Sequence, residues 1–203
     1  MSKENKFWDW FLKNNFRYRS LNQITDKYLK ENLLNELLEH LHDYSGHLYY
    51  EIGGFANEAQ ELVISAEGKK EYFNEVERLI EEAPSISSWK FTAFKQPSDS
   101  LFVTEYEGLV LDPKLMWFEP LDNENDPSVL GLVVYLKNYT KRHKELFVVG
   151  VFKVLDTLLG EKSTALNIQY LDINKLPANP KKKGLIELVD LPKYISWRNK
   201  KTS

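Results

Sequence analysis

The chain has 203 residues, of which 42% are hydrophobic and 13% aromatic, so it can build a substantial core, and we expect no disorder except at the ends. It contains no cysteine, which excludes disulfides, iron–sulfur clusters, thiolate zinc sites and cysteine nucleophiles, and suits a reducing cytoplasm. The formal net charge of −3 gives the chain as a whole no attraction for nucleic acid. We therefore expect a cytoplasmic protein.

A chain of this length is compatible with one domain or with two. We expect a single α+β domain over residues 1–203. Within it we expect an N-terminal helical segment over about residues 4–44 and a basic C-terminal tail over about residues 175–203. Charges at Lys6 and Asp9 interrupt the N-terminal segment, and no apolar run reaches the roughly 18 residues of a transmembrane helix. We expect neither a signal peptide nor a membrane span.

The first predicted helix, residues 6–15, has an apolar side and a charged side. Its apolar side carries Phe7, Trp8, Trp10, Phe11 and Leu12. Aromatic side chains opposite lysines would suit a helix that lies on a membrane surface. The helix is short and contains Asp9, however, so we favour docking against the protein's own core or a second subunit.

A longer helix is predicted over residues 23–44, where leucines and polar residues separate onto opposite faces from Leu33 onward. The apolar arc consists of Leu33, Leu34, Leu37, Leu38 and Leu41. Gly46 then ends the helix, since glycine favours the backbone conformation that follows a helix end.

Residues 47–94 predict a hairpin that leads into a βαβ unit. The expected elements are strands over 47–52 and 61–66, a helix over 68–83 and a strand over 89–94. Pro84 ends the helix because proline lacks a backbone donor and clashes with the preceding turn. The last two strands should be parallel, with a right-handed crossover through the helix.

The segment from Glu61 to Pro97 contains three short motifs. They are the strand end ISAEG, the helix stop AP and the strand W…AFKQP, and a fourth motif, LGE, follows at residues 159–161. On these motifs about half of the chain resembles a group of uncharacterised bacterial proteins. The resemblance implies a small, soluble bacterial α+β domain, and it brings no activity or catalytic residues with it.

The second half of the chain predicts short strands, a loop and one long buried strand. Short strands are expected over 101–106, 109–111 and 115–119, an acidic loop over 119–127, and a strand buried on both faces over 129–136. Residues 164–171 predict a strand with Leu166, Ile168 and Tyr170 facing the core. Residues 185–197 predict a short terminal element that is compatible with a helix.

Residues 146–159, LFVVGVFKVLDTLL, are the segment around which we expect the fold to be built. On a helical wheel their apolar side chains surround almost the whole circumference, and only Lys153 and Asp156 interrupt them. The segment is too short to span a bilayer, and its length favours a helix over a strand. We expect a central helix, started by Thr140 and ended by Gly160, between a sheet and a second helical layer or another subunit.

Together these elements predict an α+β fold. We expect a mixed, largely antiparallel sheet that contains one βαβ unit. Helices should pack against this sheet, with the apolar helix at the centre of the fold.

The polar face of the second helix holds the best candidate for a metal site. Glu36, His40 and Asp43 share one face at helical spacing, and His47 follows just after the helix. Carboxylates and imidazoles in such an arrangement can hold zinc, manganese or iron. A polar face that only meets solvent is the simpler interpretation, because no HExxH motif and no second carboxylate–histidine pair accompany these residues.

Motifs for nucleotide cofactors are missing from the sequence. It contains neither GxGxxG nor a P-loop, and it lacks the GxSxG motif of a serine nucleophile. Asp122, Glu124 and Asp126 alternate as in a calcium loop, but Pro127 occupies the position that requires glycine. We therefore expect no cofactor.

The C-terminal tail, residues 175–203, concentrates positive charge, with eight bases against two acids and thus a net charge of +6. Lysines can hold phosphates and aromatic rings can stack on bases. A nucleic-acid contact would use Lys181, Lys182, Lys183, Trp197 and Arg198. We favour a solvated basic terminus near the acidic helix over 68–83, and we do not expect nucleic acid as a partner.

Two functions remain open on the sequence. The favoured one is a non-enzymatic interaction or regulatory module that acts through protein–protein contacts, because a helix that is apolar on all sides needs cover. Its partner would be a second copy of the chain, forming a homo-oligomer, or another protein. The alternative is a small metal-dependent enzyme centred on Glu36, His40, Asp43 and His47.

Overall fold

The structure divides the chain into two compact units, Met1–Lys95 (unit 1) and Gln96–Ser203 (unit 2). It is a computed structural model that describes residues 2–54, 58–98, 103–122 and 129–202. Helices and strands occur together in both units, which confirms the α+β fold class. A single domain over the whole chain stays a prediction, because compactness does not show whether either unit folds alone.

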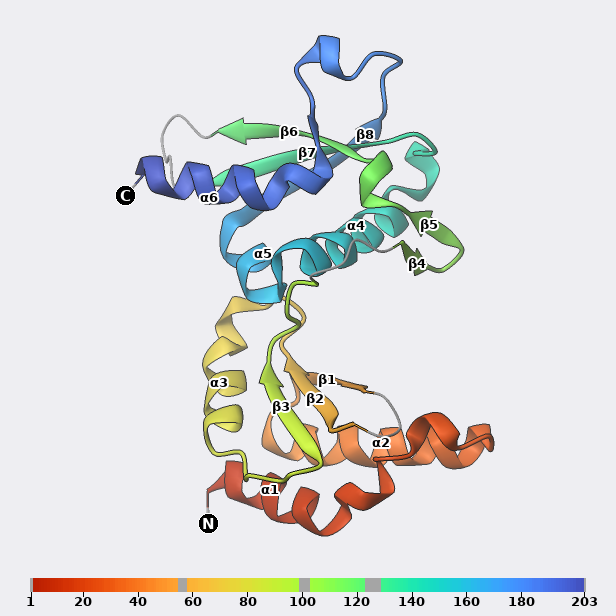
Figure 1. The fold of residues 1–203 in the computed structure, drawn as a ribbon, viewed down its shortest axis with the longest axis vertical. Helices are drawn as coiled ribbons and strands as arrows, with labels where there is room; N and C mark the ends of the chain where they lie inside the picture. Colours follow the sequence, from red (N-terminus) through yellow and green to blue (C-terminus); the bar gives the residue numbers. More distant parts are fainter. Residues whose placement is uncertain (1, 55–57, 99–102, 123–128, 203) are drawn as a thin grey trace. The chain divides into compact units, whose positions relative to one another are not determined.

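Unit 1 combines three helices with a three-stranded sheet in the residues described (Figure 1). Its elements are α1 Lys3–Asn14, α2 Lys27–Tyr44, β1 Tyr49–Gly53, β2 Gln60–Ser65, α3 Phe73–Glu81 and β3 Trp89–Ala93, with 3₁₀ turns at Asn15–Arg17, Leu21–Gln23 and Lys70–Tyr72. The strand order is β1-β2-β3, with β1 antiparallel and β3 parallel to β2. Strands β2 and β3 and helix α3 therefore form the predicted βαβ unit.

Helix α1 is docked on the core of unit 1. Phe7, Trp8 and Phe11 are buried. The rings of Trp8 and Phe91 have centroids 4.6 Å apart, and the indole Nε1 of Trp8 donates a hydrogen bond to the carbonyl oxygen of Leu79 in α3 at 2.6 Å. The interpretation that this helix packs against the protein's own core is therefore confirmed.

Unit 2 contains, in its described part, a four-stranded sheet, a two-stranded hairpin and three helices (Figure 1). Its elements are β4 Thr104–Tyr106, β5 Leu109–Leu111, β6 Trp117–Asp122, β7 Leu130–Leu136, α4 Lys144–Leu159, α5 Glu161–Asn167, β8 Ile168–Lys175, β9 Ile186–Glu187 and α6 Leu191–Thr202, with 3₁₀ turns at Pro113–Leu115, Lys141–His143, Lys181–Lys183 and Leu188–Asp190. The larger sheet has the order β8-β7-β6-β9, with β7 parallel to β8 and antiparallel to β6. The buried strand predicted over 129–136 is confirmed as β7, and the strands of the described residues of both units form three sheets, where one mixed sheet was expected.

The predicted apolar helix is confirmed as α4, which contacts β4, β5, β8, α5 and α6. At Gly150 the helix and the hairpin approach so closely that a Cβ atom would lie 2.7 Å from Leu111 Cδ1. The helix ends at Leu159, and Gly160 follows with φ +80°, a conformation that favours glycine. Neither α4 nor any other helix of the described residues is long and apolar enough to cross a membrane.

The loop predicted over 119–127 begins later than expected, because β6 continues to Asp122. Pro120 is tolerated in this strand although it lacks a backbone donor. On one side, Pro120 pairs with Leu132 of β7. On the other side of β6, strand β9 pairs only with Trp117 and Phe118 and does not reach Pro120. The remainder of the predicted loop lies outside the described residues.

The strand predicted over 164–171 is wrong in its first half, because residues 161–167 form helix α5. The backbone N–H of Thr164 donates to the carbonyl oxygen of Gly160, so the chain resumes helical hydrogen bonding directly after α4. Packing of α5 against α4 overrides the alternating pattern in the sequence. Leu166 and Tyr170, both predicted to face the core, are 52% and 55% exposed.

Candidate functional site

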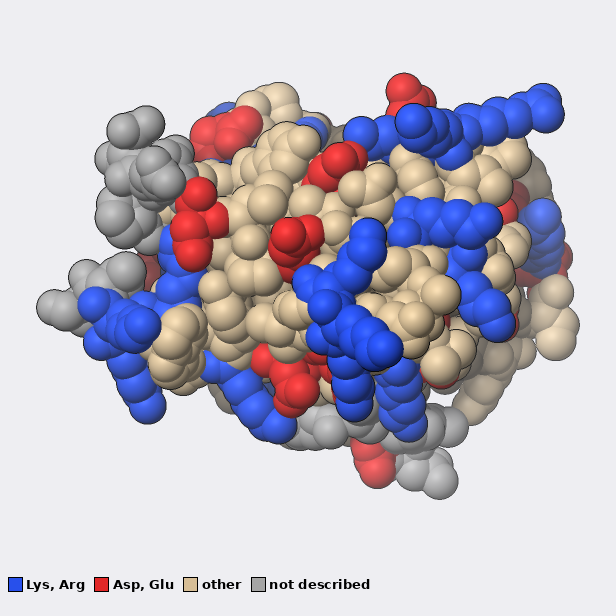
Figure 2. All heavy atoms as spheres, turned by 90° about the horizontal axis from the view of Figure 1, so that it is seen from above, with Lys and Arg blue, Asp and Glu red and all other residues tan. Residues whose placement is uncertain are grey.

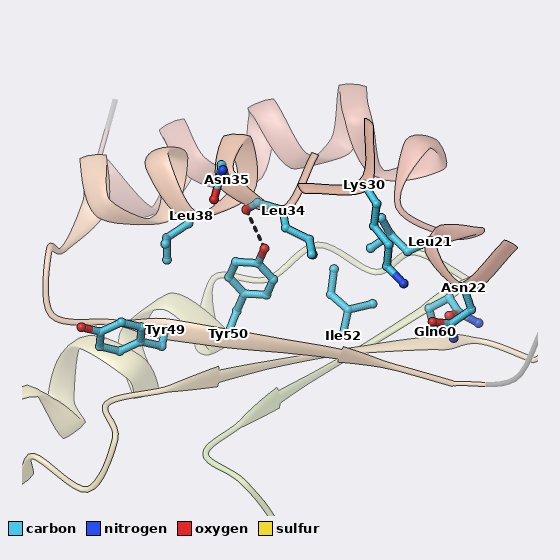
Figure 3. A pocket seen from close by; sticks show the side chains of 10 residues that line it. All are labelled: Leu21, Asn22, Lys30, Leu34, Asn35, Leu38, Tyr49, Tyr50, Ile52 and Gln60. Atoms are coloured by element: carbon cyan, nitrogen blue, oxygen red, sulfur yellow. Dashed lines mark hydrogen bonds between the residues drawn. The ribbon is translucent and has the colours of Figure 1, made fainter. Parts of the chain in front are cut away.

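Unit 1 contains a pocket between helix α2 and strand β1 (Figure 3). Its volume of about 430 Å³ falls within the range of about 300–1,000 Å³ that small-molecule sites occupy. We call it the α2–β1 pocket, and its lining residues are Leu21, Asn22, Lys30, Leu34, Asn35, Leu38, Tyr49, Tyr50, Ile52 and Gln60. Most of the lining is aliphatic or aromatic, with a few polar groups, which is the usual composition of a ligand site.

Helix α2 can supply one wall of the pocket because its apolar surface is two residues wide. The line that packs into the core consists of Leu33, Leu37 and Leu41, all buried. The adjacent line consists of Lys30, Leu34 and Leu38, and its two leucines each follow a leucine of the buried line by one position. Because these three residues are four positions apart, their side chains are neighbours along one side of the helix. This second line faces the pocket.

Strand β1 supplies the floor of the pocket. Tyr50 and Ile52 alternate with exposed residues, so both point from the same face of the strand. The Tyr50 hydroxyl donates a hydrogen bond to the backbone carbonyl oxygen of Leu34 at 2.6 Å, which joins the floor to the wall (Figure 3). Burial raises the pKa of Tyr50, so this hydroxyl stays protonated and remains a donor at neutral pH.

One end of the pocket is polar and positively charged. Figure 3 shows Lys30, Asn22 and Gln60 at this end, with Leu38 and Tyr50 farther along. Lys30 is the one ionised side chain among the lining residues. None of the ion pairs found in the described part of the chain includes it. The lining of the pocket therefore carries a net positive charge.

Unit 2 exposes an apolar surface on α4, although the sequence predicts cover around the whole helix. Val149 is 43% and Phe152 39% exposed, whereas most other apolar residues of the helix are buried. The two residues are three positions apart, so their side chains adjoin on the helix surface. Next to them the Lys153 ammonium lies 5.2 Å from the centre of the Tyr106 ring. We call Val149 and Phe152 the α4 flank.

Two of the four predicted metal ligands, Glu36 and His40, contact side chains of the N-terminal part of unit 1. Both carboxylate oxygens of Glu36 accept hydrogen bonds from the Arg17 guanidinium, at 2.8 and 2.7 Å, and this pairing raises the pKa of Arg17. The His40 imidazole stacks on Trp10 with ring centroids 3.9 Å apart. These contacts hold α1 and the turn after it against α2.

The other two predicted ligands, Asp43 and His47, also have separate neighbours. Asp43 forms an ion pair with Lys6, and His47 stacks on Tyr72 with ring centroids 3.9 Å apart. Within the described residues, no group of three or more His, Asp or Glu side chains is placed to hold a metal ion together. The structure thus does not bring the predicted ligands to one point. Of the calcium-like positions, Glu124 and Asp126 lie outside the described residues.

The predicted nucleic-acid residues lie on two elements of unit 2. Lys181, Lys182 and Lys183 form an exposed 3₁₀ turn, where Lys181 pairs with Glu187 at 3.4 Å. Figure 2 shows one face of the molecule, on which Lys and Arg side chains are spread with Asp and Glu side chains between them. Positive charge on this face is therefore not one uninterrupted surface.

Trp197 and Arg198, on α6, differ in their accessibility. Arg198 is 8% exposed; its Nη2 donates to the carbonyl oxygen of Val129 at 2.9 Å, and its Nε lies 3.4 Å from Asp122 Oδ1. Trp197 is exposed, and the Lys201 ammonium lies 4.4 Å from its ring centre. Arg198 thus fastens α6 to the sheet of unit 2, while Trp197 remains accessible.

Comparisons with known proteins add no relationship, since no family model, no curated protein and no solved structure matches the chain. The resemblance of residues 61–97 to bacterial proteins therefore stays a prediction. Any functional interpretation depends on the geometry of the α2–β1 pocket and the α4 flank.

Of the pocket residues, Leu34 and Leu38 belong to the predicted apolar arc of α2, while no pattern in the sequence predicts the pocket itself. An apolar arc of this width is usual on a helix that packs against a core, so the arc by itself did not indicate a pocket. Lys30 extends the outer line by one turn from Leu34, and this cation directly beside apolar positions marks the polar end of the pocket. Asn22 and Gln60 gave no comparable signal, because only the tertiary fold brings them to this place.

Proposed function

We propose that the chain is a non-enzymatic interaction module that acts through protein–protein contacts, with the α4 flank as its contact surface. The exposure of Val149 and Phe152 on the most apolar helix supports this proposal. Single exposed apolar side chains are common on proteins, but here two of them adjoin on one helix. Covering the exposed part of both would contribute roughly 1 kcal/mol for each side chain.

The proposed partner is a protein, either a second copy of this chain or another chain. Lys153 and Tyr106 beside the flank would form part of a polar rim, as is usual around the apolar centre of a protein interface. A bacterial source and a cytoplasmic location, which the motif resemblance and the lack of cysteine suggest, belong to the same proposal.

Photocrosslinking from the α4 flank tests the proposal. The crosslinking amino acid p-benzoylphenylalanine replaces Phe152 in one variant, and in the control it replaces Leu166, which is 52% exposed but lies on α5. We expect a discrete crosslinked product from position 152 alone, in cells or in concentrated purified protein. A product of twice the chain mass would identify a second copy as partner, and equal crosslinking from both positions would contradict the proposal.

The competing proposal is a small metal-dependent enzyme centred on Glu36, His40, Asp43 and His47. The contacts found among the described residues do not bring the four together: His40 and Asp43 line one small pocket that also includes Lys6, while Glu36 pairs with Arg17 and His47 stacks on Tyr72. Metal analysis of the purified protein distinguishes the two proposals. An interaction module should hold no stoichiometric zinc or manganese, whereas metal that His40→Ala removes would favour the enzyme.

A further inference from the structure

We propose that the α2–β1 pocket binds a small apolar carboxylate, with the carboxylate beside Lys30 and the apolar tail between α2 and β1. The pocket has two chemically different ends, a cationic one with amide groups and an aliphatic one. A ligand with one negative head and an apolar tail matches both ends at once. This site lies in unit 1, and the proposal does not depend on the α4 flank.

The surroundings of Lys30 favour an anion. Lys30 lies in the first turns of α2, where the positive end of the helix dipole disfavours a cation and favours an anion. Nearby acids have other partners: Asp26 accepts a hydrogen bond from the backbone N–H of Leu29, and Glu31 pairs with Lys27 at 3.6 Å. A carboxylate bound here would pair with the Lys30 ammonium and could accept a hydrogen bond from a neighbouring amide.

The rest of the pocket suits a tail of several carbon atoms. Leu34, Leu38 and Ile52 line it, and the hydrogen bond between Tyr50 and Leu34 holds wall and floor together without a ligand. A preformed apolar pocket binds more tightly because little ordering is needed on binding. Each methylene buried there should strengthen binding about fourfold.

An apolar carboxylate can be a free aliphatic acid or the C-terminal residue of a polypeptide. Hexanoate represents the first source and N-acetyl-leucine the second, and both can be titrated into the full chain by calorimetry. Hexan-1-ol has the same tail without the charge, and hexylammonium has the opposite charge. We expect saturable binding of at least one carboxylate, about fivefold or more tighter than the alcohol and the ammonium ion. The tighter carboxylate identifies the source.

Variants of α2 assign the binding to the pocket. Lys30→Gln should weaken carboxylate binding about fivefold or more and leave hexan-1-ol binding unchanged, and Lys30→Glu should reverse the preference toward hexylammonium. Lys27→Gln is the matched control, because Lys27 is on the same helix, is exposed and does not line the pocket. Leu34→Trp should fill the pocket and abolish binding, with Leu29→Trp as its control on the exposed side of α2.

The proposal would be overturned by equal binding of carboxylate, alcohol and ammonium ion, or by no saturable binding up to about 10 mM, a concentration at which even weak small-molecule sites begin to fill. It would also be overturned if Lys30→Gln and Lys27→Gln weakened carboxylate binding equally. Circular dichroism of each variant shows whether it is folded. If Leu34→Trp does not fold, the charge variants at Lys30 decide the outcome, because a reversed preference cannot result from misfolding.

Discussion

Two ion pairs connect the N-terminal segment of unit 1 to α2, and their geometry indicates that they contribute unequally to the stability of the fold. Arg17 and Glu36 form two parallel hydrogen bonds, and each side chain is about one third exposed. Lys6 and Asp43 form a single contact at 3.3 Å, with more than half of each side chain exposed. A bidentate pair is stronger than a single exposed contact, so Glu36 should contribute to stability and Asp43 very little.

Removing the charge of Glu36 tests this difference. Glu36→Gln should lower the free energy of unfolding by about 1 kcal/mol, since the Arg17 guanidinium loses a charged partner. Asp43→Asn should change it by less than about 0.5 kcal/mol. Urea unfolding of both variants, with and without a metal chelator, measures the effect. A loss for Glu36→Gln that disappears in the chelator would show a metal site at Glu36 and contradict the purely structural role.

A substitution at Gly150 tests how closely α4 and the β4–β5 hairpin approach each other. Its missing side chain allows α4 and the β4–β5 hairpin to approach, and a Cβ atom there would lie 2.7 Å from Leu111 Cδ1. Gly150→Val should therefore lower the free energy of unfolding by about 1–3 kcal/mol, because overpacking outweighs the loss of a flexible glycine from the helix. The melting temperature measures this, and Gly46→Ala is the control, since nothing lies within 4 Å of a Cβ atom at Gly46. A more stable Gly150→Val protein would disprove the close approach.

At the scale of elements, the parts that the sequence predicted well are those with one strong pattern. Strand β7 is uninterrupted by charge and is buried on both faces, and α4 is too long for a strand. Residues 164–167 were mispredicted because a short alternating run is compatible with a strand and with one helical turn, and packing on α4 decides between them. The pocket depends on a pairing of α2 with β1 that no local pattern encodes, so only its leucine line was visible in the sequence.

Helix α1 should be essential to unit 1, because its aromatic side belongs to the core. Trp8→Ala should lower the free energy of unfolding by about 3–5 kcal/mol, since it leaves a large cavity and removes the hydrogen bond to the Leu79 carbonyl. Leu12 is 46% exposed, although the sequence pattern places it on the apolar side of this helix, so Leu12→Ala should cost less than about 1 kcal/mol. Chemical unfolding of the two variants measures the contrast, and equal losses would mean that α1 does not dock as described.

The start of α4 is joined to β8 by an ion pair that should make stability depend on pH. Lys144 Nζ lies 2.6 Å from Asp172 Oδ1, and this contact holds the pKa of Asp172 below its ordinary value of 3.8. A carboxylate whose pKa is lowered by folding stabilises the protein above its ordinary pKa, and this stabilisation is lost as the pH falls through the lowered value. Asp172→Asn should therefore be less stable than the parent at neutral pH.

Urea unfolding of the parent and Asp172→Asn at a series of pH values checks this prediction. The difference in stability should be constant from neutral pH down to about pH 5 and should shrink toward zero as Asp172 becomes protonated below about pH 4. High salt should reduce the difference at neutral pH, because the pair is partly exposed. A difference that is independent of pH would show that the ion pair does not stabilise the fold.

At the scale of the whole molecule, each unit has its own sheet and buried residues, and each carries one candidate surface. Unit 1 has the α2–β1 pocket and unit 2 has the α4 flank. We propose that Val149 and Phe152 of the α4 flank serve contacts outside the chain more than the core of unit 2. An apolar residue that faces solvent can be replaced at small cost, whereas one in the core cannot.

The most direct measurement compares two phenylalanines of α4 in the purified chain. Both residues are phenylalanines on the same helix, but Phe147 is 4% exposed and Phe152 is 39% exposed. Phe147→Ser should lower the free energy of unfolding by about 4 kcal/mol, and Phe152→Ser by at most about 2 kcal/mol, because part of the Phe152 side chain is already exposed. Equal losses for the two variants would mean that Phe152 supports the fold, and would contradict its assignment to a contact surface.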